Sequence, residues 1–265
     1  GLTINAYSHL VSCAEVKDNE VYCSYVQEED VIKRHILKLQ YFKVKEDGTI
    51  TNENQPYLIK AFYTEFNMLK VVKISQTEIG IVFQTGTGKE TEKIPYGNTG
   101  KDLYFYHLEV TPTNMEVVRY DYIYNNCRLR ADPEDYTVDI ISLPNKKIFG
   151  ICEVDNGGKD PDKFQLLEIN DPDKQFIQTT LGDLGKVVRN PQFVKLGDTA
   201  AILYTRIDSN GKSDVVLLKM NYPDCEDAKN NFVIYEVCPY GTQTLLSSIG
   251  SYFNIFLNNP YPSSM

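Results

Sequence analysis

The sequence predicts an all-β fold built from a repeated unit. A strand-like run, a tight polar turn and a second, more apolar strand recur about five times, in residues 9–26, 70–85, 137–154, 192–206 and 244–258. The chain also has 19 tyrosines among its 265 residues, and tyrosine and β-branched side chains suit pleated, half-buried surfaces. A recurring all-β unit of about this length is typical of the blades of a β-propeller.

Four strands can be proposed for the second, third and fourth copies of the unit, separated by turn signals such as PNK and SNG. The second strand of each copy is apolar on both faces, as expected where a sheet packs between two neighbours. The predicted strands are residues 70–74, 79–85, 102–110 and 115–122, then 136–143, 147–154, 163–169 and 175–180, and finally 192–196, 200–206, 214–220 and 232–237.

The first and last copies are irregular. Residues 31–44 can be interpreted as a helix, but residues 35–41 alternate and a GTIT run follows a DG turn, which favours a hairpin. The last copy has two strands before the sequence ends, so either residues 2–7 close a small ring or the chain is part of a larger one. We therefore expect one propeller-like domain over residues 1–265, with about five four-stranded blade units at about 1–66, 67–125, 126–183, 184–240 and 241–265.

Charge and composition exclude several function classes. The formal net charge is −9, and an acidic surface repels phosphate backbones and anionic lipid. No apolar run approaches the ~20 residues of a membrane span. We therefore expect neither a nucleic-acid partner nor membrane insertion. The absence of tryptophan also disfavours propeller families whose repeat signatures contain it.

Six cysteines form an even set without zinc-like spacing. Cys13 and Cys23 flank a KDNE turn and are expected to face each other as a disulfide, which favours an extracellular or cell-surface protein. The same geometry suggests Cys127–Cys152, and elimination leaves Cys225–Cys238. Six buried free thiols in a cytosolic chain are the alternative.

Long connections are expected at one end of the repeated unit, where binding residues usually gather. Acidic residues in these loops and tyrosines beside them define the predicted binding face: Glu28, Glu29, Asp30, Tyr120, Tyr122 and Tyr124. Exposed tyrosines offer rigid contact area for protein or glycan. For the run at residues 103–110, core packing between sheets is the favoured interpretation.

Two acidic loops contain the oxygen ligands that calcium prefers. Residues 208–214, DSNGKSD, resemble the calcium loops of integrin-like FG-GAP propellers over about ten residues, but the loop is two residues short. An Asn-Gly pair between strands is also an ordinary hairpin turn. The candidate ligands are Asp155, Asp160, Asp162, Asp208, Asn210 and Asp214; no other cofactor is expected.

No catalytic residue is predicted. The GTGKET run lacks the glycine and hydroxyl positions of a phosphate loop. His9, His35 and His107 lie far apart inside predicted strands, and no nucleophile motif accompanies them. With 36 acidic residues, the sequence does not identify a pair of carboxylates for glycoside hydrolysis.

The sequence thus favours an extracellular or cell-surface interaction or structural module that presents an acidic, loop-rich face to protein or glycan. An incomplete last unit favours a homo-oligomer or a larger assembly. The alternatives are a glycan-acting hydrolase or lyase with acidic residues at the propeller axis, and a cytosolic propeller adaptor.

Overall fold

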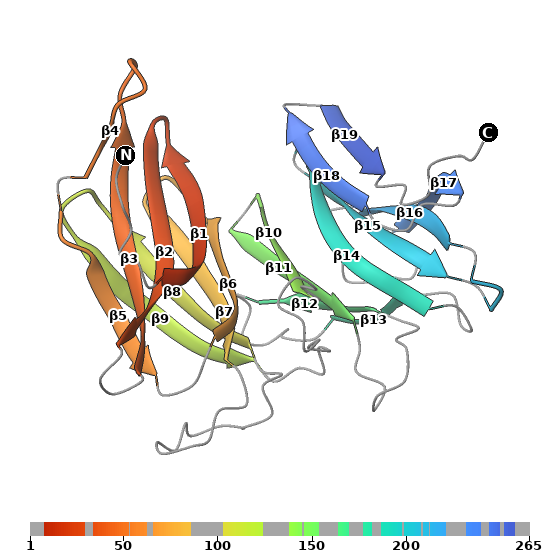
Figure 1. The fold of residues 1–265 in the computed structure, drawn as a ribbon, viewed down its shortest axis with the longest axis horizontal. Helices are drawn as coiled ribbons and strands as arrows, with labels where there is room; N and C mark the ends of the chain where they lie inside the picture. The colour runs from red at the N-terminus through yellow and green to blue at the C-terminus, as the bar shows by residue number, and fades with distance from the viewer. Residues whose placement is uncertain are drawn as a thin grey trace. The chain divides into compact units, whose positions relative to one another are not determined.

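The computed structural model consists of two compact units, Gly1–Asn125 and Asn126–Met265. Every described element is a β-strand (Figure 1). For some residues of these strands, only the backbone is described. The described residues are 8–29, 34–52, 54–62, 66–85, 103–123, 138–144, 146–153, 164–169, 177–181, 187–197, 199–207, 209–211, 213–220, 232–239, 244–249 and 252–257.

The first unit contains two antiparallel sheets. In the first sheet the order is β1-β2-β3-β4, and β5 also pairs with β3. In the second sheet the order is β6-β7-β8-β9. The strands are β1 (Ser8–Lys17), β2 (Glu20–Glu29), β3 (Arg34–Val44), β4 (Ile50–Thr51), β5 (Tyr57–Phe62), β6 (Phe66–Lys73), β7 (Glu78–Thr85), β8 (Leu103–Val110) and β9 (Met115–Ile123).

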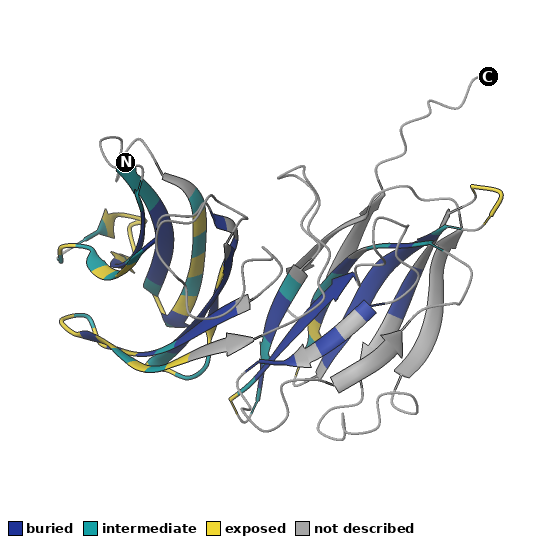
Figure 2. Ribbon diagram, turned by 90° about the horizontal axis from the view of Figure 1, so that it is seen from below, coloured by how far each residue is buried: buried dark blue, intermediate teal, exposed yellow. Residues whose placement is uncertain are grey.

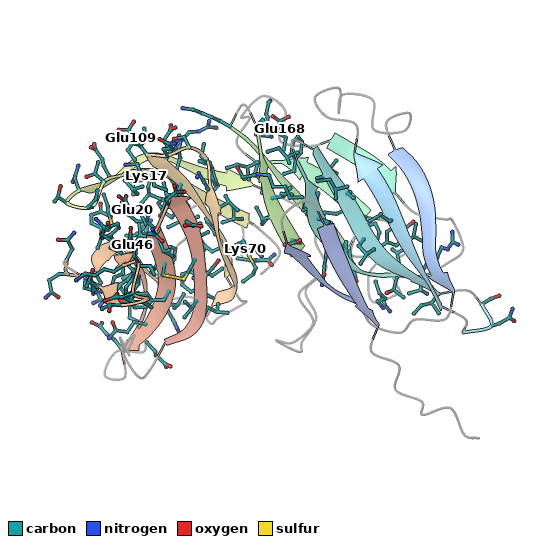
Figure 3. All side chains as sticks on the ribbon, turned by 90° about the horizontal axis from the view of Figure 1, so that it is seen from above. Lys17, Glu20, Glu46, Lys70, Glu109 and Glu168 are labelled. Atoms are coloured by element: carbon teal, nitrogen blue, oxygen red, sulfur yellow. A yellow bond between two sulfur atoms is a disulfide. The ribbon has the colours of Figure 1, made fainter. Side chains whose placement is uncertain are left out.

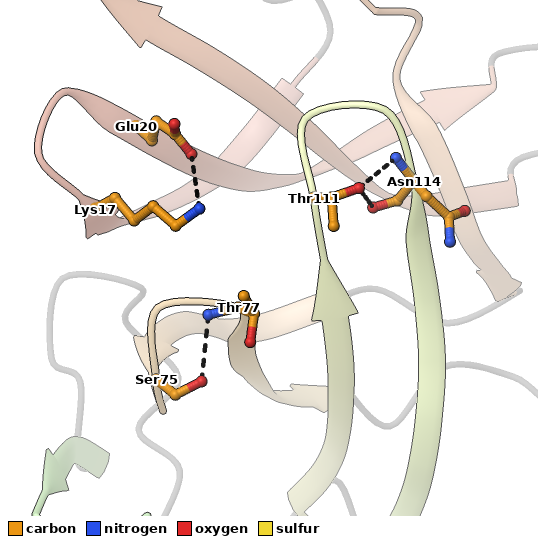
Figure 4. A network of polar contacts seen from close by, with 6 residues as sticks. All are labelled: Lys17, Glu20, Ser75, Thr77, Thr111 and Asn114. Carbon is orange, nitrogen blue, oxygen red and sulfur yellow. Dashed lines mark hydrogen bonds and ion pairs between the residues drawn. The ribbon is translucent and has the colours of Figure 1, made fainter.

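Short polar turns close the hairpins of this unit, as Figure 4 shows. Asn19, between β1 and β2, has a φ of 65°, a conformation that asparagine tolerates better than most residues. In the turn between β6 and β7, Ser75 Oγ accepts the N–H of Thr77 at 3.2 Å. Between β8 and β9, Thr111 Oγ1 accepts the N–H of Asn114 at 3.0 Å.

The core of the first unit lies between its two sheets, where buried side chains of one sheet interdigitate with those of the other. Phe83, fully buried on β7, packs against Phe62 and Phe66 at ring-centroid distances of 5.4 and 5.2 Å. The remaining buried members include Tyr22, Leu37, Leu39, Tyr41, Ile79, Ile81, Tyr104, Tyr106 and Leu108. β2 and β3 contain long buried runs, which is typical of strands covered on both faces.

The second unit contains three sheets with the orders β10-β11-β12-β13, β14-β15-β16-β17 and β18-β19. Phe149, Ile151, Phe164, Ile202 and Tyr204 are among the buried residues that form the core between its first two sheets. The strands are β10 (Val138–Leu143), β11 (Lys147–Glu153), β12 (Phe164–Glu168), β13 (Ile177–Leu181), β14 (Val187–Leu196), β15 (Thr199–Ile207), β16 (Ser213–Met220), β17 (Phe232–Pro239), β18 (Thr244–Ile249) and β19 (Tyr252–Leu257).

Within each unit, one side chain of the first sheet binds the backbone of the next. Ser12 Oγ on β1 accepts the N–H of Val71 on β6 at 2.8 Å. Asp139 Oδ2 on β10 accepts the N–H of Phe193 on β14 at 2.7 Å. Since β6 and β14 are edge strands of their sheets, these side chains satisfy backbone donors that their own sheets leave unpaired.

The all-β class and the antiparallel hairpins are confirmed. Each of the five sheets falls within the range of one predicted unit, except that β6 begins one residue before its unit, and the last sheet has two described strands. β3 forms a strand where a helix over residues 31–44 was the alternative interpretation, and it pairs with β4 as the hairpin interpretation expected. No described sheet closes on itself, and the propeller arrangement stays a prediction.

Candidate interaction surface

Large apolar side chains are exposed on two edge strands of the first unit, β5 and β9. Leu58 on β5 is 52% exposed, and Val118 and Tyr120 on β9 are 53% and 43% exposed. Figure 2 shows the exposed and intermediate residues that alternate along the strands of this unit. Val11 and Ile50 are the other large apolar residues that are exposed among those described.

β5 and β9 lie side by side although they belong to different sheets (Figure 1). The side-chain amide of Asn54, before β5, donates to the carbonyl of Pro112 in the turn before β9. Lys60 Nζ on β5 lies 5.7 Å from the ring centroid of Tyr120 and 5.8 Å from that of Phe62. A lysine ammonium over an aromatic face is attracted by the ring quadrupole, so Lys60 joins the two strands.

Tyr120 is the exposed end of an aromatic stack that continues into the core. Its ring lies 4.7 Å from Tyr106 and 6.3 Å from Tyr104, and Tyr104 stacks on Phe83 at 5.1 Å. Burial, with a smaller contribution from Tyr104, raises the pKa of Tyr106 to about 12. Burial likewise raises the pKa of Tyr120, with smaller contributions from Tyr106 and Tyr104. The hydroxyls of both rings are therefore protonated at neutral pH.

A β-bulge shapes the middle of β9. His107 pairs with Arg119 and Leu108 pairs with Val117, so Val118 is the extra residue. Because the bulge shifts the alternation by one, Glu116 and Arg119 lie on the same face of the sheet although they are three residues apart. We call the exposed side chains of the two strands the β5–β9 rim: Leu58, Lys60, Glu116, Val118 and Tyr120.

The side chains of the rim on β5 project from both faces of the first sheet. Leu58 lies opposite Lys38 and Lys60 lies opposite Leu37, so these two side chains point to different faces of the first sheet. Tyr57, Ile59 and Val117 are partly buried against the core. The rim thus combines three apolar side chains with one lysine and one glutamate, beside residues that pack against the core.

The structure brings only part of the predicted binding face together. Glu29 forms an ion pair with Arg34 at 2.8 Å at one end of β2 and β3, and Glu28 is half-buried beside it. Tyr120 belongs to the rim. The backbone of Tyr122 lies in β9, while its side chain, Asp30 and Tyr124 lie outside what the structure describes.

Most of the proposed calcium ligands cannot be placed. Asp155, Asp160, Asp162 and Asp208 lie outside the described residues, as does the GTGKET run. Asn210 is exposed in a turn, and Asp214 has only its backbone described, in β16. Among the residues that the structure describes, no group of three or more His, Cys, Asp or Glu is placed to hold a metal ion. In the same residues no helix is long and apolar enough to cross a membrane.

The Cys13–Cys23 disulfide is confirmed. The two residues are directly paired across β1 and β2, with a Cα–Cα distance of 4.1 Å. Cys152 is fully buried and also disulfide-bonded, but its partner is not among the described side chains. The pairings Cys127–Cys152 and Cys225–Cys238 stay predictions.

The tyrosine run on β8 is core, as expected: Tyr104 and Tyr106 are 1% and 5% exposed. His35 is buried and His107 is half-buried, where His107 Nε2 lies 3.2 Å from a carboxylate oxygen of Glu78. His9 lies in β1.

Sequence reasoning missed several polar groups in the interior. Glu153 is fully buried at the end of β11, with Arg189 at 3.8 Å, and Lys147 forms an ion pair with Glu168 across two strands. Gln84 on β7 is fully buried. It also missed Lys60, Glu116 and Val118 of the rim, for which no local sequence pattern was a sufficient signal.

Comparison with known proteins assigns no family. No protein-family model matches the chain, and no curated protein matches it. A hypothetical protein from Leishmania major is similar with a TM-score of 0.35 and 8% identity, over 82% of this chain and 62% of that one. A mannose phosphorylase from Leishmania mexicana, in complex with phosphate ion, has a TM-score of 0.36 and 10% identity, over 76% and 59%. The chain spans about three fifths of each of these proteins, and likenesses this low carry no argument about fold or function.

Proposed function

We propose that the chain is an extracellular or cell-surface interaction module that binds a protein partner through the β5–β9 rim. The acidic loops predicted from the sequence belong to the same proposal, as a separate set of contacts. The single observation that carries the proposal is the rim itself. Exposed apolar side chains gathered on neighbouring edge strands are a recognised mark of interaction sites.

The chemistry of the rim favours a protein over a glycan. Leu58, Val118 and Tyr120 offer apolar contact area, and an edge strand offers main-chain donors and acceptors to an extended partner segment. The ring of Tyr120 already packs against Tyr106 and lies under Lys60, which leaves less of its face for a stacked sugar. Tyrosine and charged neighbours at a rim are common features of protein interfaces.

The disulfide supports the proposed compartment. Disulfides persist in oxidising environments and are rare in the cytosol, and Cys13–Cys23 joins two directly paired residues. Cys13 is exposed, so a reducing compartment would have access to it.

Site-specific photo-crosslinking tests the binding function. A photoreactive phenylalanine analogue replaces Tyr120 or Leu58 in the full chain, which is then exposed to native extracellular and surface proteins. A control variant carries the same analogue at Lys45, which is exposed before the β3–β4 turn. We expect one protein to crosslink from both rim positions and not from Lys45, and the purified partner to bind at least about tenfold more weakly to Tyr120→Ala.

Equal crosslinking from the rim and from Lys45, or no change in affinity on Tyr120→Ala, would contradict the proposal. The compartment is tested separately by mapping Cys13 and Cys23 in protein taken from its native cells. We expect a linked peptide pair in surface-accessible material; reduced thiols in intracellular material would overturn the extracellular assignment.

A further inference from the structure

We infer that β9 pairs edge to edge with β9 of a second copy of this chain, in antiparallel orientation, with Glu116 of each copy opposite Arg119 of the other. This inference deepens the proposed function, on which it rests, because it names a partner for one strand of the β5–β9 rim. The experiment below separates its failure from that of the proposed function.

The first step is the free edge of β9. The strand is nine residues long, and among the described residues β8 is its one hydrogen-bonded neighbour. Alternate residues along an edge strand direct their N–H and C=O groups away from the sheet, where another strand can pair with them. Two exposed apolar side chains, Val118 and Tyr120, lie on this strand.

The second step is the arrangement of charge along the strand. Glu116 is exposed and lies directly opposite the exposed Glu109 of β8, and like charges in this position are unfavourable. Figure 3 labels Glu109 on the ribbon of the first unit. A cation on the other side of Glu116, where the edge is free, would offset this repulsion.

The third step is the self-complementarity of the strand. In a two-fold antiparallel pair of bulged strands, each bulge counts as one ladder position, so Val118 and Arg119 together face one residue of the second copy. When Glu116 is opposite Arg119 of the second copy, Met115 is opposite Tyr120 and Val117 is opposite Val117. The bulge at Val118 puts Glu116 and Arg119 on one face, and Met115 and Tyr120 on the other, since they pair with Val110 and Tyr106. Paired residues therefore share a face, as an antiparallel ladder requires.

This register creates two equivalent ion pairs and places the exposed ring of Tyr120 in each copy beside Met115 of the other. A two-fold interface uses the same patch on both partners, and β9 meets that condition with its own sequence. An unrelated extended segment would have to supply the same charges in the same order, so a second copy is the occupant that the charges favour.

The test uses the full chain at physiological ionic strength and sedimentation across about two decades of protein concentration. We expect a monomer–dimer equilibrium. Glu116→Arg alone and Arg119→Glu alone place like charges opposite each other twice, and each is expected to weaken the dimer by about tenfold or more. The double variant E116R/R119E restores opposite charges and is expected to recover the original dissociation constant within about threefold.

Two controls accompany these variants. Glu46→Arg makes the same charge change at an exposed turn residue between β3 and β4 (Figure 3) and should leave the dissociation constant unchanged. In the Glu116→Arg variant, the substituted side chain lies opposite Glu109 across the β8–β9 ladder and replaces a like-charge pair by an opposite-charge pair. This variant should therefore be at least as stable to denaturant as the original chain. Its loss of dimerisation therefore cannot be attributed to unfolding.

A monomer at every concentration overturns the inference, and so does a dimer that neither single variant weakens or that the double variant fails to restore. In those cases a protein that crosslinks at Tyr120 would leave the proposed function standing with another partner. A dimer with the expected charge-swap behaviour, together with no other crosslinked protein, identifies self-association as the function of the rim.

Discussion

Ser12 Oγ accepts the backbone N–H of Val71 at 2.8 Å, and Asp139 Oδ2 accepts that of Phe193 at 2.7 Å. The two acceptors occupy the same place in the repeated unit: each lies in the fifth ladder pair from its hairpin turn. Their donors begin the similar runs Val-Val-Lys-Ile and Phe-Val-Lys-Leu. The same inter-sheet hydrogen bond therefore recurs in both units.

Removing either acceptor is expected to destabilise its unit. Ser12→Ala and Asp139→Ala each leave a backbone N–H without this partner, at a cost of about 1–3 kcal/mol in the free energy of unfolding. Denaturant unfolding measures the change. Ser12→Thr and Asp139→Asn keep an acceptor oxygen and serve as controls; equal losses for the alanine and control variants would show that the hydrogen bond is not the cause.

Removing the Cys13–Cys23 disulfide is expected to lower the free energy of unfolding by about 2–3 kcal/mol, because the bond closes a short loop in the unfolded chain. The two cysteines are 10 residues apart. The double variant C13S/C23S should keep its strand content by circular dichroism and unfold at lower denaturant concentration. An unchanged midpoint would mean that the β1–β2 hairpin is held fully by packing.

Alkaline pH is expected to destabilise the first unit through Tyr106. Its pKa in the folded chain is raised to about 12, mainly by burial, whereas the unfolded chain ionises near its ordinary value of about 10. The folded state then retains a proton that the unfolded state has lost, so stability is fully present below pH of about 10 and falls as pH rises toward about 12. Unfolding midpoints at a series of pH values measure this slope.

Tyr106→Phe tests whether Tyr106 causes this decrease of stability with pH. Phenylalanine keeps the ring and lacks the titrating hydroxyl, so the decline between the two pKa values should become shallower. Tyr22 is a second buried tyrosine whose pKa burial raises, and its contribution should persist. A slope that Tyr106→Phe leaves unaltered would contradict the role given to Tyr106.

The buried side-chain amide of Gln84 is expected to lower the free energy of unfolding. It is fully buried, and its side-chain nitrogen and oxygen have no hydrogen-bond partner among the described residues. Gln84→Met has a similar shape without the amide and should raise the free energy of unfolding by about 1–3 kcal/mol. A lower unfolding midpoint for Gln84→Met would show instead that the amide is satisfied in solution; Gln84→Glu, which buries a charge, should be destabilising in either case.

The strands of this fold could be predicted where the determinants are local. The apolar runs of β7, β11 and β15 and the polar turns beside them are consecutive in the sequence, and the strands lie close to the expected ranges. Cys13 and Cys23 were likewise predictable, because a two-residue turn fixes the register of the hairpin. Residues 187–191 were missed at the start of β14, since the Asn-Pro pair inside this strand resembles a turn signal.

The interaction surface could not be predicted because its contacts join distant parts of the chain. Lys60 meets Tyr120 only after two sheets have packed together, and no local pattern encodes that approach. Ser12 and Asp139 resemble ordinary solvent-facing residues of a strand, and only the neighbouring sheet shows what they bind. The bulge at Val118 changes which residues share a face, and two adjacent valines alone do not reveal it.

The position of Ser12 and Asp139 has a practical consequence for dividing the chain. In β6 the fifth ladder pair from the turn contains Leu69, which cannot accept a hydrogen bond. Among the described residues, the recurring bond joins the first sheet of each unit to the second. A researcher who wishes to express half of this protein would cut after Asn125, because a gene split there keeps each acceptor and its donor in one polypeptide.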